Sequence, residues 1–157
     1  MAELVVLDLD ETLIHACSEW IGHSHDFIAA NSMVHIRPGT KEFLDRIFKY
    51  YDVAIWTAST GQYLGQVVEK LFVNYKLEFI WDRTHCDIET DRDGYDIFVK
   101  DISRLHQVGY RNFVIIDDRP ENIRPNSDTV IAVKPYYGSR DDMELLKLSN
   151  AIFNSVV

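Results

Sequence analysis

The sequence is poor in cysteine and in long apolar runs, and each absence excludes a class of protein. Only two of its 157 residues are cysteines, Cys17 and Cys86. They form no CxxC pair or zinc-type spacing, so the sequence predicts neither a disulfide framework nor a zinc site. No apolar run approaches the ~18 residues of a membrane span. The N-terminus also lacks the basic start and apolar stretch of a signal peptide. We therefore expect a soluble, intracellular protein, cytoplasmic or nuclear, with no membrane partner.

Basic residues are also scarce, because 25 acidic residues face 16 basic ones and the formal net charge is −9. A protein that binds long nucleic acids normally presents a basic stripe, and no basic run is found here, so such a partner is not expected. The composition, with 46% hydrophobic and 26% charged residues, is ordinary for a globular protein. We predict a single domain over residues 1–157, with no room for a separate lid domain.

Apolar runs and helical spacings alternate along the chain. Short runs rich in β-branched residues predict buried strands at 4–7, 53–56, 113–116 and 129–133. Apolar residues at helical spacing predict helices over 40–51 and 62–72. A last helix is expected to begin at Ser139 and to direct four apolar side chains inward: Met143, Leu145, Leu146 and Leu148. Strands that alternate with helices indicate an α/β fold, with a parallel sheet and helices on both faces.

Two stretches interrupt this alternation. Residues 26–36 are expected to form a hairpin that turns at Asn31-Ser32. The segment 81–99 contains the strong turn signal Asp91-Arg92-Asp93-Gly94 and predicts a second hairpin. Ser59 followed by Gln62 resembles a capping box, which places the start of the second helix just after Thr57. We expect small hairpin-like insertions above the sheet edge and no large cap domain.

Carboxylates follow two of the predicted strands. Asp8 and Asp10 come directly after the first strand, and Asp117-Asp118 follows the third. In parallel sheets, ligands bind beyond the carboxyl ends of the strands, so these side chains are expected to meet. Carboxylates held close together repel each other unless a cation relieves the strain. Mg²⁺ prefers oxygen ligands and suits this arrangement.

The same edge of the sheet offers the other groups that phosphoryl transfer needs. A carboxylate can act as the nucleophile and form an aspartyl phosphate that water later hydrolyses. Lys100 follows the apolar run Ile97-Phe98-Val99, and its ammonium group is expected to reach the strand ends. Thr57 offers a hydroxyl where the second helix begins, and the backbone N–H groups at Thr57 and Ala58 would face an anion.

At this point the motifs resemble those of a known family. The segment Asp8-Leu9-Asp10-Glu11-Thr12-Leu13-Ile14-His15 resembles the first motif of the haloacid dehalogenase superfamily. More narrowly, it is similar to the NLI-interacting-factor-like small phosphatases, which act on the carboxy-terminal domain of RNA polymerase II. Further similar segments follow in family order: Arg37-Pro38-Gly39, Ile55-Trp56-Thr57-Ala58-Ser59, Arg83 with Cys86, Val99-Lys100-Asp101 and Ile115-Ile116-Asp117-Asp118-Arg119-Pro120. The resemblance covers essentially the whole chain.

The resemblance implies a Rossmann-like fold and a division of roles within the site. Asp8 would be the nucleophile, and Asp10 would act as general acid and then as general base. Thr57 and Lys100 would bind the phosphoryl group. Asp8, the main-chain carbonyl of Asp10, and Asp117 would hold Mg²⁺.

The chain departs from the polymerase-tail enzymes at Asp118, where they commonly carry asparagine. Asp118 therefore stays open between a metal ligand and a turn residue. The segment 15–34 is also shorter than the corresponding insertion in those enzymes.

The sequence therefore predicts a Mg²⁺-dependent phosphatase for phosphate monoesters, with phosphoserine or phosphothreonine in a peptide or protein as the preferred substrate. One alternative keeps the chemistry but takes a small metabolite, a nucleotide or a nucleic-acid end. A second is a binding module that retains the fold without turnover.

Overall fold

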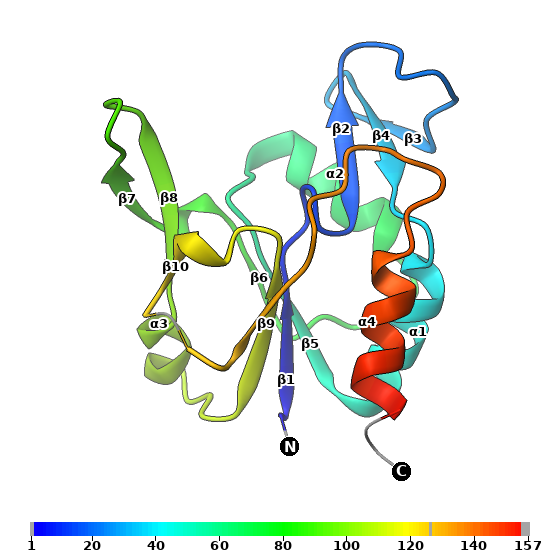
Figure 1. The fold of residues 1–157 in the computed structure, drawn as a ribbon. Helices are drawn as coiled ribbons and strands as arrows, with labels where there is room; N and C mark the ends of the chain where they lie inside the picture. Colours follow the sequence, from blue (N-terminus) through cyan, green and yellow to red (C-terminus); the bar gives the residue numbers. More distant parts are fainter. Residues whose placement is uncertain (1, 126, 155–157) are drawn as a thin grey trace.

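A five-stranded parallel sheet forms the centre of the molecule (Figure 1). The computed structural model describes residues 2–125 and 127–154. In spatial order the strands are β11 (Val130–Ala132), β9 (Phe113–Asp117), β1 (Leu4–Leu7), β5 (Asp52–Trp56) and β6 (Ile80–Trp81). The four strands predicted from apolar runs are all present. The two-residue strand β6 was not predicted, because it is too short to show a periodicity.

The register of the three central strands brings their ends to one level. Leu7 of β1 lies beside Ile55 of β5 and Ile116 of β9. The residues that follow these three therefore lie at the same carboxyl edge of the sheet, with Asp8 beside Asp117. The two carboxylates predicted from separate motifs are thus neighbours through strand register alone.

The two faces of the sheet are covered differently. Val5 and Leu7 pack with three helices, α1 (Thr40–Tyr50), α2 (Gly61–Leu71) and α4 (Glu144–Asn154). Leu4 and Val6 point the other way and pack near the short helix α3 (Ser103–Gln107). This alternation follows from the two-residue period of a strand buried on both faces. Helices on both faces are confirmed, and none of the described helices is long and apolar enough to cross a membrane.

Two small three-stranded sheets rise on either side of the carboxyl end of β1 (Figure 1). One contains β2 (Ile14–Cys17), β4 (Ser32–Ile36) and β3 (Phe27–Ala29). The other contains β10 (Ile123–Arg124), β8 (Asp96–Asp101) and β7 (Asp87–Thr90). Short 3₁₀ turns lie at Arg83–His85 and Pro120–Asn122. The insertions are small, as predicted.

Both predicted hairpins are present. The chain turns between β7 and β8 at Asp91-Arg92-Asp93-Gly94, as predicted. The turn between β3 and β4 lies at Ala30 and Asn31, whose φ angles are 45° and 68°, one residue earlier than predicted. This hairpin gains a third strand, because β2 pairs with β4. The sequence showed no signal for β2 beyond its continuity with the first motif.

The predicted capping box is wrong. Helix α2 begins at Gly61 after Thr60, and no side chain caps it. The Ser59 hydroxyl instead donates a hydrogen bond to the Asp10 carboxylate. The residue predicted to cap α2 therefore binds Asp10, which lies in a distant part of the chain.

The start of the last helix is also different from the prediction. Helix α4 begins at Glu144, whose N–H donates to Asp142 Oδ1 over 3.1 Å, and Ser139 lies in the preceding turn. Leu145 is buried and Leu148 packs on the core, but Met143 and Leu146 are exposed. Met143 precedes the first helical residue and Leu146 is turned toward solvent, so only two of the four apolar side chains point inward.

Candidate active site

Asp8 lies where β1 leaves the sheet. Its N–H still continues the ladder by donating to Ile116 O over 3.0 Å. The chain then turns sharply at Glu11, whose φ of 61° is uncommon for a residue other than glycine. This turn keeps Asp8, Asp10 and Thr12 together above the end of the strand.

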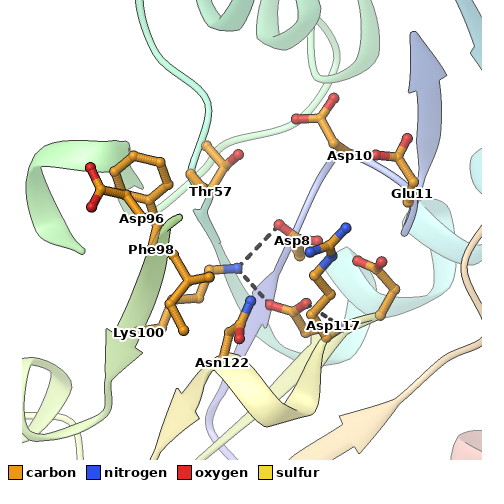
Figure 2. A pocket seen from close by; sticks show the side chains of 13 residues that line it. Asp8, Asp10, Glu11, Thr57, Asp96, Phe98, Lys100, Asp117 and Asn122 are labelled. Carbon is orange, nitrogen blue, oxygen red and sulfur yellow. Dashed lines mark hydrogen bonds and ion pairs between the residues drawn. The ribbon is translucent and has the colours of Figure 1, made fainter. Parts of the chain in front are cut away.

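Lys100 bridges two carboxylates at the bottom of the site (Figure 2). Its Nζ donates to Asp8 Oδ1 over 3.1 Å and to Asp117 Oδ2 over 2.6 Å. Burial alone would lower the pKa of Lys100, but the two carboxylates outweigh burial and raise it. Lys100 therefore stays positively charged at neutral pH. It reaches the sheet from β8, which pairs with β10 and not with a central strand.

Three carboxylates converge beside this lysine. Ligand oxygens of Asp8, Asp117 and Asp118 lie within 4.8 Å of one another. Burial raises the pKa of Asp8 to about 6 against the pull of Lys100. Burial and the nearby Asp8 also raise the pKa of Asp117 to about 6, and burial raises the pKa of Asp118. The single positive charge of Lys100 therefore does not balance the charge of the three carboxylates. Their oxygen atoms form a donor set that fits a hard divalent cation such as Mg²⁺.

The buried hydroxyl of Thr12 joins the carboxylates. It lies 3.0 Å from Asp8 Oδ2 and 3.2 Å from Asp118 Oδ1, and it accepts the Asp118 N–H over 3.1 Å. Asp118 therefore contacts the site directly, and the reading of Asp118 as a turn residue alone is too limited. Whether it ligates a metal stays a prediction.

The Asp10 side chain points away from Asp8 and Asp117 (Figure 2). It is directed toward the start of α2, where its hydrogen-bond partners lie. Its Oδ2 accepts the Ser59 hydroxyl, and its Oδ1 accepts the Tyr63 hydroxyl over 2.5 Å. Burial and the neighbouring Asp10 carboxylate raise the pKa of Tyr63, so its hydroxyl remains protonated and can donate. Both oxygens of Asp10 are thus held from one side.

A cavity of about 240 Å³ opens above these groups. All the residues predicted for the site line it: Asp8, Asp10, Thr57, Ala58, Lys100, Asp117 and Asp118. Thr57 is buried, and its Oγ1 accepts the Ser59 N–H over 3.0 Å, which shapes the loop after β5. The β7–β8 hairpin adds Asp96, Ile97 and Phe98 to the wall. The site is therefore an acidic cavity with one buried lysine at its base.

A buried arginine anchors the loop that carries Asp8 and Asp10. Arg37 Nε and Nη2 donate to both oxygens of Asp142, over 2.8 and 3.0 Å. Its Nη1 also donates to Thr12 O over 3.0 Å, and its Nη2 donates to Lys134 O over 2.7 Å. The guanidinium therefore ties the first motif to the segment before α4.

Arg83, which had no assigned role, connects two walls of the site. Its Nε donates to Ala58 O over 2.8 Å, and its guanidinium carbon lies 4.3 Å from the ring centre of Phe98. It therefore joins the loop after β5 to the β7–β8 hairpin.

Sequence reasoning missed the supporting side chains of the site. The sequence pattern predicts a helix cap at Ser59 and indicates no role for the side chains of Tyr63 and Arg37. Tyr63 shows no local signal, because Ser59 lies before the first helical residue and helical spacing does not relate the two side chains. No local pattern indicates that Arg37 pairs with Asp142.

Comparison with known proteins assigns the family. Residues 3–155 match the NLI interacting factor-like phosphatase family. The chain belongs to this family. The resemblance predicted from the motifs is therefore confirmed.

Individual members of this family share about 30% of their residues with the chain. The chain is 30% identical over 162 residues to CTD nuclear envelope phosphatase 1B of Danio rerio, an alignment that covers 93% of the chain and 64% of the relative. It is 29% identical over 152 residues to a probable C-terminal domain small phosphatase of Dictyostelium discoideum, covering 92% of the chain and 47% of that relative. The chain thus spans between about half and two thirds of the length of these curated relatives.

A solved structure has the same fold. Fission yeast RNA polymerase II CTD phosphatase Fcp1-R271A, bound to beryllium fluoride, superposes with a TM-score of 0.60 at 20% identity. The match covers 98% of this chain and 50% of that one. The likeness supports the Rossmann-like α/β fold.

Proposed function

We propose that the chain is a Mg²⁺-dependent phosphatase that hydrolyses phosphate monoesters through a phosphorylated Asp8. The observation that carries the proposal is the Lys100 ammonium group shared between Asp8 and Asp117 at the base of the cavity. A shared lysine holds the Asp8 carboxylate in one orientation and places a positive charge where a phosphoryl group would enter. The family match supports the same reaction.

The first chemical step transfers the phosphoryl group to the protein. An Asp8 oxygen forms a bond to phosphorus as the ester P–O bond breaks, and Asp10 gives its proton to the leaving oxygen. Thr57, the Ala58 backbone and Lys100 bind the phosphoryl oxygens. Bound Mg²⁺, held by Asp8, the Asp10 carbonyl, Asp117 and Asp118, would offset the negative charge that gathers on these oxygens.

The second step releases phosphate. Asp10, now ionised, takes a proton from a water molecule whose oxygen attacks phosphorus. The bond between phosphorus and Asp8 breaks, and the carboxylate is restored. Asp10 lines the cavity from the side opposite Lys100, which leaves room for the leaving group and then for water between them.

A phosphorylated serine or threonine in a peptide or protein is the proposed substrate class. The insertions are two small three-stranded sheets on either side of the carboxyl end of β1, so an extended segment can approach the cavity without passing a large cap. The names of the relatives, which are C-terminal domain phosphatases, point the same way. Turnover of a phosphoserine-peptide panel, compared with nucleotides and sugar phosphates, tests this choice. Exclusive turnover of the small esters would overturn it.

The proposed nucleophile is tested by Asp8→Asn. We expect turnover to fall by about 10³-fold or more, because an amide cannot attack phosphorus, while the far-UV spectrum is unchanged. Asp101→Asn is the matched control, since this carboxylate lies one residue after Lys100, accepts the Ser103 N–H over 2.9 Å and is not among the residues that line the cavity. Its activity should stay near that of the wild type. Full activity of Asp8→Asn would refute the assignment.

A further inference from the structure

The Asp10 carboxylate is held at both oxygens by hydroxyl groups from one short stretch of chain. Ser59 donates to Oδ2 and Tyr63 donates to Oδ1 over 2.5 Å. Ser59 closes the loop that begins with Thr57, and Tyr63 lies in the first turn of α2. The start of α2 therefore fixes both the loop proposed to bind phosphate and the proposed acid and base.

The two hydroxyl groups act on Asp10 and not on the cavity. Asp10 lines the cavity, whereas neither Ser59 nor Tyr63 belongs to its wall. A carboxylate bound at one oxygen still rotates about its last torsion, because that torsion is broad. Hydrogen bonds at both oxygens remove this freedom, while each oxygen keeps a second lone-pair direction for a proton. The arrangement thus fixes the direction of proton transfer.

We propose that Ser59 and Tyr63 are positioning residues that aim Asp10 at the leaving oxygen, and that they adapt the site to alkoxide leaving groups. This inference rests on the proposed function. When the ester P–O bond breaks, an alkoxide such as that of serine needs the Asp10 proton, whereas a nitrophenolate leaves without one. The orientation of Asp10 therefore affects the cleavage of alkyl esters strongly and that of nitrophenyl esters hardly at all.

Two aryl esters of nearly the same shape separate this role from a structural one. Phenyl phosphate has a poor leaving group and para-nitrophenyl phosphate a good one, and kcat/KM reports the steps up to phosphorylation of Asp8. For the double variant Ser59→Ala/Tyr63→Phe, we expect kcat/KM to fall by about 10-fold or more with phenyl phosphate and by less than about 3-fold with the nitrophenyl ester. Ser59→Thr, which keeps a hydroxyl, should retain the wild-type ratio.

Tyr75→Phe is the matched control. The Tyr75 hydroxyl also donates to a carboxylate, that of Asp45, but this pair is exposed and lies outside the cavity wall. We expect neither ester to be affected. Thermal melting of each variant shows whether it is folded, and the single variants Ser59→Ala and Tyr63→Phe give the same test if the double variant is unstable.

The outcomes separate this inference from the proposed function. Equal losses with both esters, or no loss with either, would overturn the positioning role. Asp10→Asn should show the same selective loss in a stronger form. If Asp10→Asn is selective and the hydroxyl variants are not, only the positioning role fails. If Asp10→Asn is not selective either, Asp10 is not the acid and the proposed mechanism fails with it.

Discussion

At the scale of single residues, the site is dominated by buried charges that do not balance. Lys100 is one ammonium group among three converging carboxylates, and both Asp8 and Asp117 are almost fully buried. Burial raises the pKa of each of these two aspartates to about 6. Without a cation, folding at neutral pH must therefore place ionised carboxylates where burial disfavours their charge.

This imbalance predicts a pH-dependent stability. A carboxyl group with a raised pKa stabilises the fold below its unfolded value of 3.8, and this contribution is lost as the pH rises through about 6. In the absence of divalent cations, Asp8→Asn should therefore gain melting temperature relative to the wild type between pH 4 and pH 7. We expect a gain of about 5 °C.

The measurement is the difference in melting temperature between Asp8→Asn and the wild type at each pH, in chelator. Using the difference removes the contributions of distant carboxylates such as Asp82 and Asp101, whose pKa values are lowered. Asp117 adds to the gain, because the Asp8 charge helps to raise its pKa. A difference that does not change across this range would show that Asp8 is not held in an unfavourable charge state.

At the scale of elements, Arg37, which directly follows β4, connects this strand to the segment before α4. The side chain is 1% exposed. Its partners Asp142 and Lys134 O lie 105 and 97 residues away in the chain, whereas Thr12 O lies 25 residues away. Removing a buried partner of an ion pair leaves the other charge and the carbonyl groups without their donors.

Arg37→Ala is accordingly predicted to lower the free energy of unfolding by about 4 kcal/mol. Activity should fall as well, because the Thr12 end of the loop that carries Asp8 and Asp10 loses its anchor. Urea denaturation measures the first effect. Arg92→Ala, at the exposed tip of the β7–β8 hairpin, is the control and should change stability by less than about 0.5 kcal/mol. A loss of under about 1 kcal/mol for Arg37→Ala would contradict the anchoring role.

At the scale of the whole molecule, a bound cation would connect separate strands of the sheet. Asp8 follows β1, and Asp117 ends β9, so one ion between them would link two central strands. A ligand that binds only the folded chain stabilises it, by about 2.7 kcal/mol at 100 times its Kd.

Saturating Mg²⁺ should therefore raise the melting temperature by about 5 to 10 °C. Asp117→Asn should lose most of this shift, because it removes a charged ligand, whereas Asp101→Asn should keep it. Differential scanning calorimetry with and without Mg²⁺ provides the measurement. An undiminished shift in Asp117→Asn would place the cation elsewhere.

The sequence by itself determined the central sheet and the carboxylates at its edge. The runs 4–7 and 113–116 are apolar at every position, which specifies buried parallel strands, and the acids that follow them must lie at the carboxyl edge. Strand and helix signals are local, so the predicted strands, both hairpins and the helices α1 and α2 are present within one or two residues.

Only the tertiary structure decided how those carboxylates are held. Lys100 reaches them from a separate sheet. Ser59 donates to Asp10 and does not cap a helix, and Arg37 pairs with Asp142. Each of these contacts joins residues distant in the chain, and it depends on strand register and loop path. No local periodicity encodes those quantities, because they are set by how the whole chain packs.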